Sequence, residues 1–281
     1  MKTCESMSTY EEILGYAERQ LTDAGIEDAK IDAWYLMEYA FGINRAYYFL
    51  NKDKSALAGE KDKYSEYIKK RAMHIPLQHI TGTQEFMGLE FKVDENVLVP
   101  RQDTENLVEQ ALPHVKGKKV LDMCTGSGCI AVSVKILGGA ARCDAADISD
   151  EALEIAYYNA KKNNAYITFI KSDMFDNITE KYDVILSNPP YIRPDVIKGL
   201  MPEVREHEPM LALDGGNDGL DFYRILAEKS KEHLEKDGIV MMEIGYDQGS
   251  DVKNLFENNG YLDVKVIKDY SGNDRIVKAH L

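Results

Sequence analysis

The sequence predicts an α/β protein in which a doubly wound sheet with a C-terminal antiparallel hairpin follows a small helical domain. Two patterns lead to this prediction. Strand-like and helix-like segments alternate over residues 104–281, whereas residues 1–85 show helical periodicity and no long strand. Between them, residues 86–103 have the apolar alternation of a hairpin and are predicted to link the two domains.

The helical domain is predicted from capping signals and apolar faces. Thr9 and Glu12 have the spacing of a capping box and are expected to begin a first helix. Gly25 follows the apolar face of that helix and is expected to end it. Three further helices are expected over residues 28–42, 44–48 and 60–71. Residues 75–85 contain Pro76 and Gly82 and are expected to form a loop.

The sheet domain is predicted from short apolar runs separated by helical patterns. Strands are expected over residues 119–123, 142–146, 167–171, 184–187 and 239–244, and helices over residues 129–137, 151–163, 219–234 and 252–259. Two extended runs near the end of the chain flank the turn residues 271–274 and predict a hairpin at the sheet edge. In such sheets, ligands bind at the carboxyl ends of the strands.

The composition excludes several classes of function. The chain has 281 residues, with 34 Lys and Arg against 48 Asp and Glu, so its net charge is −14. This charge argues against direct, sequence-independent nucleic-acid binding and against docking on an anionic membrane. No segment approaches the about 18–20 apolar residues of a membrane span, and residues 1–5 lack the apolar run of a signal peptide. We therefore expect a cytoplasmic protein.

The cysteines do not indicate a metal site. Cys4, Cys124, Cys129 and Cys143 show no Cys-x-x-Cys spacing and no nearby pair of histidines. We expect no bound metal and reduced cysteines that pack as small apolar groups.

A glycine turn follows the first strand of the sheet domain. Gly126 is expected to take a positive φ, and Gly128 would let the backbone approach a ligand closely. Together with Ala131, these glycines match the dinucleotide pattern G-x-G-x-x-A. A tight strand–helix turn with no ligand uses the same glycines, so this motif alone does not decide.

Acidic residues after the next two strands favour an adenosine-type ligand. Asp147 lies about 20 residues after the glycines, where a carboxylate accepts both ribose hydroxyl hydrogens. Asp173 follows the third strand and is placed to meet an adenine amino group. NAD and S-adenosylmethionine fit these three elements equally well.

Asn188-Pro189-Pro190-Tyr191 directly follows the fourth strand and favours S-adenosylmethionine. The two prolines remove two backbone donors, which leaves carbonyl acceptors without competing amides. The Asn188 oxygen and the Pro189 carbonyl can hold both hydrogens of a planar NH2 group, while Tyr191 covers its flat face. This arrangement suits methyl transfer to an amide or aromatic-amine nitrogen. The structural alternative is a Pro-Pro turn that only closes a strand.

The chain resembles the HemK/PrmC family of release factor glutamine methyltransferases along nearly its whole length. Beside the NPPY motif, the similar segments are residues 21–26, 32–33, 76–82, 85–86, 99–105, 208–209, 212–213, 215–220 and 269–275. The segment 99–105, Val-Pro-Arg-Gln-Asp-Thr-Glu, is similar to the family's rather specific PRxDTE segment. NPPY by itself is shared with adenine-N6 DNA methyltransferases, so these other segments point to release factors.

The resemblance implies a Rossmann-like class I methyltransferase fold and S-adenosylmethionine as the methyl donor. It implies that the substrate is the glutamine of the Gly-Gly-Gln motif in class 1 peptide chain release factors. Residues 104–281 would be the methyltransferase domain, and residues 1–85 would dock the substrate. Carried over by position, the donor would be held by Cys124, Thr125, Gly126, Ser127, Gly128, Asp147, Asp173, Met174 and Asn188.

The same resemblance implies that Asn188, Pro189, Pro190 and Tyr191 grip the glutamine. One position departs from the family, because Cys124 stands where glycine is usual. A β-carbon there would narrow the room beside the donor if the backbone needs a positive φ, so we expect a locally adjusted loop.

Three other readings are weaker. An adenine-N6 nucleic-acid methyltransferase would need a basic groove and a pocket for a flipped base, which the net charge of −14 disfavours. A non-catalytic adaptor that binds S-adenosylmethionine has no use for an amide clamp. A dehydrogenase has no role for the NPPY motif.

Overall fold

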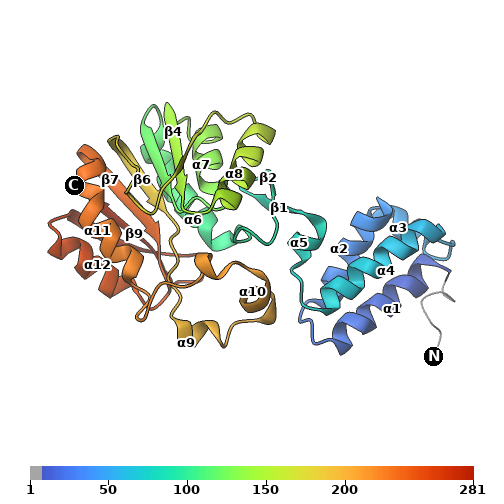
Figure 1. Ribbon diagram of the computed structural model, residues 1–281. Coiled ribbons are helices and arrows are strands. Elements are labelled where there is room, and N and C mark those ends of the chain that lie inside the picture. Colours follow the sequence, from blue (N-terminus) through green and yellow to red (C-terminus); the bar gives the residue numbers. More distant parts are fainter. Residues whose placement is uncertain (1–7) are drawn as a thin grey trace. The chain divides into compact units, whose positions relative to one another are not determined.

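The computed structural model describes residues 8–281, so Cys4 lies outside the described residues. The chain divides into two compact units, which are described separately (Figure 1). Unit 1 contains the chain up to Gly82 together with the segment 202–207, and unit 2 contains Thr83–Met201 and Glu208–Leu281. The hairpin that the sequence predicts from residue 86 begins at Thr83 and belongs to unit 2.

Unit 1 is helical. Its helices are α1 (Tyr10–Asp23), α2 (Ala29–Phe41), α3 (Arg45–Asn51), α4 (Ala58–Ala72), α5 (Leu77–Thr81) and α10 (Pro202–His207). The capping box of α1 is confirmed, since the Glu12 amide donates to Thr9 Oγ1 at 3.2 Å and Glu12 Oε2 accepts from the Thr9 amide. The prediction of a loop over residues 75–85 is wrong in part. This segment contains α5, which ends at Gly82 with φ of 74°.

The core of unit 1 is an apolar cluster between α1, α2 and α4. Its fully buried members include Leu21, Ala33, Leu36, Met37, Tyr64 and Ile68. Beside it lies a buried ion cluster around Arg71, which pairs with Asp32 of α2 at 2.6 Å and with Glu203 of α10 at 2.9 Å. The short helix α10 is therefore tied to unit 1 by charge, although it comes from the second half of the chain.

Unit 2 is built on a seven-stranded sheet of order β5-β4-β3-β6-β7-β9-β8. Its strands are β3 (Lys119–Met123), β4 (Arg142–Asp147), β5 (Thr168–Lys171), β6 (Tyr182–Ser187), β7 (Leu234–Glu243), β8 (Leu262–Lys268) and β9 (Asp274–His280). The first five run parallel, and β9 pairs antiparallel with both β7 and β8. The predicted fold class and its C-terminal hairpin are confirmed. A separate two-stranded sheet is formed by β1 (Thr83–Phe86) and β2 (Leu89–Lys92).

Helices cover both faces of the sheet in unit 2 (Figure 1). One face packs against α6 (Gln102–Val115), α7 (Cys129–Ile136) and α8 (Asp150–Lys162), and the other against α11 (Asp221–His233) and α12 (Gly249–Asn258). Neighbouring residues of a strand enter opposite layers, as Val120 and Leu121 show. The long β6–α11 connection holds α9 (Pro194–Ile197), α10 and the 3-10 helix η2 (Met210–Ala212).

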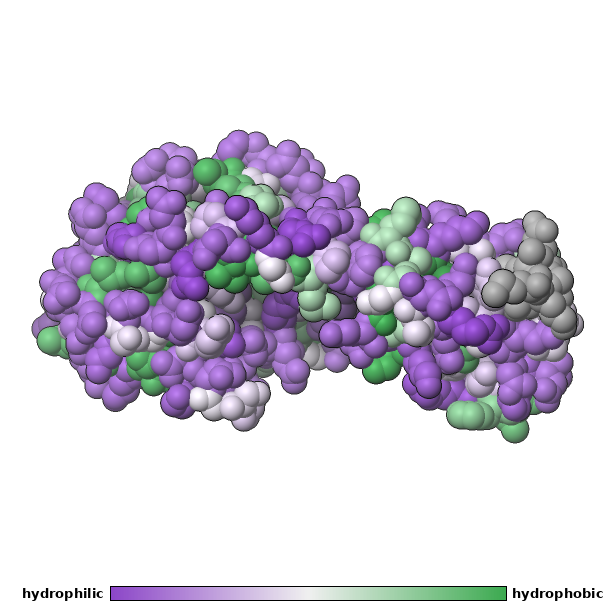
Figure 2. Space-filling model, turned by 90° about the horizontal axis from the view of Figure 1, so that it is seen from below, coloured by the Kyte–Doolittle hydropathy of each residue, from purple (hydrophilic) through white to green (hydrophobic). Residues whose placement is uncertain are grey.

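The surface agrees with the acidic composition. Most of the face seen in Figure 2 is hydrophilic, and apolar residues lie on it in separate patches. Among the helices of residues 8–281, none is long and apolar enough to cross a membrane.

Candidate active site

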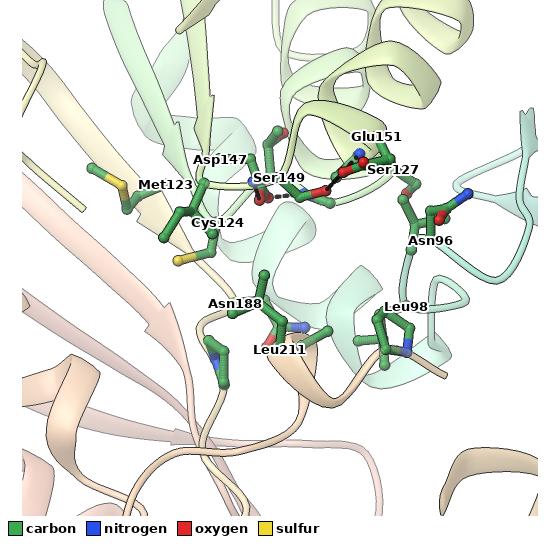
Figure 3. Close-up of a pocket in the computed structure, with 18 of the residues that line it drawn as sticks. Asn96, Leu98, Met123, Cys124, Ser127, Asp147, Ser149, Glu151, Asn188 and Leu211 are labelled. Atoms are coloured by element: carbon green, nitrogen blue, oxygen red, sulfur yellow. Dashed lines mark hydrogen bonds between the residues drawn. The ribbon is translucent and has the colours of Figure 1, made fainter. Parts of the chain in front are cut away.

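A pocket of about 500 Å³ lies at the carboxyl ends of the parallel strands of unit 2 (Figure 3). The chain leaves β3 toward β4 on one side, while β6 pairs with β3 on the other side. Such a switch in strand order leaves a crevice that binds ligands in doubly wound sheets. The volume is within the range of sites for small molecules and cofactors, about 300–1,000 Å³.

The pocket brings together most of the residues that the sequence singled out. Those that line it are Cys124, Thr125, Gly126, Ser127, Asp147, Asp173, Met174, Asn188 and Pro190. Figure 3 shows Cys124 and Asp147 along one side of the pocket, with Asn188 and Leu211 along another. Gly128, Pro189 and Tyr191 are not among the lining residues.

Asp147 is fixed at the end of β4 by two backbone amides. Its Oδ2 accepts from the Gly126 amide at 2.8 Å, and its Oδ1 accepts from the Ser149 amide at 3.0 Å. Burial raises the pKa of this carboxyl, and the backbone hydrogen bonds oppose that shift. Each carboxylate oxygen keeps acceptor capacity beyond these bonds, so the group can still receive two hydroxyl hydrogens from a ligand.

The two glycines of the turn have different surroundings. Gly126 has φ of 53°, and a β-carbon there would meet no atom within 4 Å, so the turn is open at this point. Gly128 has φ of 79°, and a β-carbon there would lie 3.1 Å from the β-carbon of Ala156 on α8. The close approach that the sequence predicts at Gly128 is therefore made by a helix of the protein.

Cys124 keeps the left-handed backbone that the position requires. Its φ is 62°, a conformation that costs a non-glycine residue roughly 1–2 kcal/mol. Its Sγ lies 3.7 Å from Met174 Sδ, and Met174 also has a positive φ of 44°. Burial, with the charge of Asp147, raises the pKa of the Cys124 thiol well above its usual range. The thiol is therefore neutral, and Cys124 adds a soft apolar wall to the pocket.

Asn188 follows β6 and lines the pocket opposite the glycine turn. Its Nδ2 donates to Thr104 Oγ1 of α6 at 3.1 Å. Tyr191 is turned away from the pocket, since its hydroxyl donates to Glu243 Oε1 at 3.2 Å. Its backbone carbonyl accepts from Gln248 Nε2 at 3.0 Å, which anchors the chain after the two prolines.

Several residues of the site are identified only in the structure. Glu95, Asn96, Val97 and Leu98 reach the pocket from the segment after the hairpin, Leu211 and Ala212 reach it from the β6–α11 connection, and Phe222 reaches it from α11. Glu243 is buried at the end of β7, where it accepts from Thr104 and Tyr191. These contacts join residues more than fifty positions apart, so no local pattern reveals them.

Three charged residues at the start of α6 contact segments that are distant in the sequence. Arg101 Nη2 donates to both carboxylate oxygens of Glu208, at 2.8 and 2.7 Å. Asp103 pairs with Arg275 at 3.2 Å, and Glu105 Oε1 accepts from the Met87 amide. The first of these pairs fixes the start of α6 to the connection that carries Pro209 and η2 toward the pocket.

Comparison with known proteins decides the family. Residues 12–82 match the PrmC N-terminal domain, and residues 102–201 match the Methyltransferase small domain. The chain is 38% identical over 277 residues to the release factor glutamine methyltransferase of Geobacter sulfurreducens, covering 97% of both chains. The chain belongs to the release factor glutamine methyltransferase family.

Other members of the family match most of the chain. The release factor glutamine methyltransferase of Moorella thermoacetica is 39% identical and covers 97% of this chain, and that of Clostridium acetobutylicum is 37% identical and covers 88%. Among solved structures, a methyltransferase from Pyrococcus furiosus superposes with a TM-score of 0.55 at 19% identity. That match covers 80% of this chain and 98% of the other, and it shows that the two share a fold.

As a methyltransferase of this family, the protein uses S-adenosylmethionine as its methyl donor. The pocket fits that group in three respects. Its volume is about 500 Å³, its glycine turn is open at Gly126, and the Asp147 carboxylate is oriented by two amides beside that turn. A carboxylate at the end of the second strand is the usual partner of a ribose in this class of sheet.

Proposed function

We propose that this protein methylates the side-chain amide nitrogen of the glutamine in the Gly-Gly-Gln motif of class 1 peptide chain release factors. The observation that carries the proposal is the position of Asn188, which follows β6 and faces the same pocket as Asp147. An acceptor for amide hydrogens and an acceptor for ribose hydroxyls then share one site. The names of the relatives supply the substrate class.

The donor would be held by the glycine turn and the two strand ends after it. We assign the ribose hydroxyls to Asp147, the adenine edge to Asp173 and Met174, and the methionine side to Cys124 and Thr125 together with their neighbours Gly126, Ser127 and Gly128. Gly128 would act through the shape of the turn, because α8 lies against it. S-adenosylmethionine supplies an electrophilic methyl group on a positively charged sulfur.

The glutamine would be held through its NH2 group. An amide nitrogen is a poor nucleophile because its lone pair is delocalised into the carbonyl. The Asn188 side-chain oxygen and the Pro189 carbonyl would accept the two hydrogens, which aims the lone pair into the pocket. Orientation of this kind contributes up to about 7–11 kcal/mol in favourable cases. Pro190 and Tyr191 would fix the clamp, the first at the pocket wall and the second through Glu243.

We assign substrate docking to unit 1, which contains all but the last three of the residues 1–85 that are expected from the sequence to dock the substrate. Large apolar side chains are exposed on it, among them Phe49 at 68%, Leu50 at 83% and Leu57 at 68%. Phe49 and Leu50 are adjacent in the sequence, and neighbouring exposed apolar side chains favour contact with a protein partner. A substrate of this kind also places the enzyme in the cytoplasm and requires no nucleic-acid binding.

Docking and chemistry can be tested separately. Changing Phe49 and Leu50 together to serine is expected to raise KM several-fold for an intact release factor and to leave methylation of a short Gly-Gly-Gln peptide unchanged. The control is Tyr166→Ser in unit 2, which removes an equally exposed side chain. Equal KM values for the intact factor in all three proteins would refute docking on this surface.

The activity itself is tested by methyl incorporation from labelled S-adenosylmethionine into a purified release factor. A matched substrate, in which the glutamine of the Gly-Gly-Gln motif is changed to glutamate, keeps the shape but lacks the NH2 group. We expect incorporation into the first protein and none into the second. Equal labelling of both would refute the proposal, and labelling of added DNA or RNA instead would favour the adenine-N6 alternative.

A further inference from the structure

Glu243 is a buried carboxylate at the end of β7, beside the strand that carries Asn188. It is 2% exposed and accepts two hydrogen bonds from hydroxyl groups. Thr104 Oγ1 donates to its Oε2 at 2.7 Å, and the Tyr191 hydroxyl donates to its Oε1 at 3.2 Å. Glu243 does not line the pocket, so it acts on the pocket only through these two partners.

The direction of these hydrogen bonds follows from the chemistry of the groups. An ionised carboxylate only accepts, and a threonine hydroxyl has one hydrogen to give. Because Thr104 gives that hydrogen to Glu243, its oxygen can only accept from Asn188. The structure has this arrangement, with Asn188 Nδ2 lying 3.1 Å from Thr104 Oγ1.

This series of hydrogen bonds fixes which end of the Asn188 amide faces Thr104. With Nδ2 committed to Thr104, the Oδ1 atom lies on the other branch of the same planar group. Asn188 lines the pocket (Figure 3), and its neighbour Thr104 lines it too. The assignment of amide atoms here rests on the hydrogen-bond network around them.

We propose that Glu243 and Thr104 are positioning residues that hold Asn188 with its carbonyl oxygen toward the substrate. The inference deepens the proposed function, because an NH2 group can be held only by an acceptor. If the Asn188 amide were flipped, its NH2 group would face the NH2 group of the glutamine. Two donors cannot form a hydrogen bond, so the glutamine would not be held. The same carboxylate holds Tyr191, so one buried charge orients both ends of the NPPY motif.

The protonation state of Glu243 sets the direction of the hydrogen bonds that run from Asn188 through Thr104 to Glu243. Once protonated, Glu243 can donate to Thr104, whose hydroxyl can then donate to Asn188 Oδ1 and favour the flipped amide. Burial raises the pKa of Glu243, and the bond from Thr104 and the charge of Arg275 oppose that shift. The other titratable and charged groups around it are Asp103 on α6, Cys129 on α7, Tyr191 after β6 and Tyr223 on α11. We therefore expect kcat to fall on the acidic side as Glu243 takes up a proton.

The first test is a matched pair of variants at Thr104. Thr104→Val keeps the shape but removes the hydroxyl, whereas Thr104→Ser keeps the hydroxyl. We expect Thr104→Val to lower kcat roughly 10- to 100-fold, as the loss of groups that orient a ligating side chain does, with unchanged affinity for S-adenosylmethionine. Thr104→Ser is expected to keep most of kcat and to keep the fall of kcat at acidic pH. Thr104→Val is expected to lose that pH dependence. Equal kcat in both variants would overturn the proposal.

The second test does not depend on the substrate. In protein labelled with 15N at asparagine, the side-chain NH2 signal of Asn188 is assigned by its loss in Asn188→Ala. We expect this signal to shift in Thr104→Val and in Glu243→Gln and to stay in place in Thr104→Ser. A carboxamide at position 243 cannot accept from both Thr104 and Tyr191 without reversing one of them. An unmoved signal in both variants would overturn the proposal, whereas absent methylation by the wild-type protein would count only against the proposed function.

Discussion

Asp32 and Glu203 in unit 1 are held differently from Asp147 and Glu243 in unit 2. In unit 1, Asp32 and Glu203 both pair with the buried guanidinium of Arg71, at 2.6 and 2.9 Å. In unit 2, Glu208 also pairs with an arginine, but Asp147 and Glu243 are held mainly by amide and hydroxyl donors and have no cation within hydrogen-bonding distance among residues 8–281. Asp32 and Glu203 are thus compensated by a charge, and Asp147 and Glu243 by neutral donors.

This difference separates a structural role from a functional one. The Arg71 cluster ties α10 to the helices around it. Burial raises the pKa values of Asp147 and Glu243, as it does that of Asp32, but the hydrogen bonds of Asp147 leave room for further donors and those of Glu243 orient its neighbours. Carboxylates whose pKa values are shifted by burial are frequent at sites that bind and transform a ligand.

The largest expected effect is structural and lies in unit 1. Arg71→Met leaves Asp32 buried without its cation and leaves Glu203 with its contact to His74, at 3.1 Å. Breaking a buried ion pair in this way destabilises a protein by about 3–5 kcal/mol. The only tryptophan of the sequence, Trp34, is buried in this unit, so its fluorescence reports the unfolding of unit 1. We expect a large shift of that transition to lower denaturant and unchanged affinity for the donor. An unchanged transition would show that the cluster does not stabilise unit 1.

Next in size is the loss of the acceptor at the pocket. Asn188→Ala is expected to lower kcat by roughly 100-fold or more, as the loss of one positioned polar contact does in other active sites. Affinity for S-adenosylmethionine should change much less, because the interaction matters mainly in the transition state. Asn188→Asp keeps an acceptor but adds a charge beside Thr104 and Glu243. Turnover by Asn188→Ala within a few-fold of the wild-type rate would contradict the clamp.

A moderate effect is expected at the other end of the pocket. Asp147→Ala removes charge-assisted hydrogen bonds and should weaken binding of S-adenosylmethionine by roughly 1–3 kcal/mol, as measured by calorimetry. The Trp34 transition should not move, since Asp147 belongs to unit 2. Unchanged affinity would remove the ribose from the proposed contacts of Asp147.

The smallest effect concerns pH. Asp122 is fully buried under the glycine turn, where its Oδ2 accepts from Thr125 and from the Ala131 amide and its Oδ1 has no partner among residues 8–281. Burial raises its pKa to about 7. The folded state therefore keeps a proton that the unfolded state has already lost, and stability falls as the pH rises through 7.

Asp122→Asn should abolish this dependence. Between pH 6 and pH 8, the free energy of unfolding of the wild-type protein should fall by about 1 kcal/mol more than that of the variant. Chemical unfolding at the two pH values measures this difference. Parallel pH dependence in the two proteins would mean that Asp122 does not titrate in this range.

The sequence predicts the framework of unit 2 well, because its signals are local. β3 has the bounds expected from its apolar run, and the glycine turn and NPPY follow strands as predicted. The short helix α5 escapes prediction because five residues show no periodicity, although Pro76 and Gly82 mark its two ends.

Contacts between distant segments are the part that the sequence does not reveal. Neither Thr104 with Glu243 nor Arg71 with Glu203 can be paired from spacing, since each pair joins residues more than one hundred positions apart. The resemblance to the family identifies the segment around Thr104, but the hydrogen bond that its hydroxyl accepts from Asn188 is seen only in the structure. Asn188 could therefore be singled out from the sequence, and its contact with Thr104 could not.

The site of methylation in the substrate tests the central claim most directly. A purified class 1 release factor is incubated with the enzyme and S-adenosylmethionine, digested, and fragmented in a mass spectrometer. The account predicts a mass increase of one methyl group on the glutamine of the Gly-Gly-Gln motif, on its side-chain amide nitrogen, and roughly 100-fold slower appearance of that product with Asn188→Ala. A methyl group on any other residue, or an unmodified glutamine after incubation with active enzyme, would contradict it.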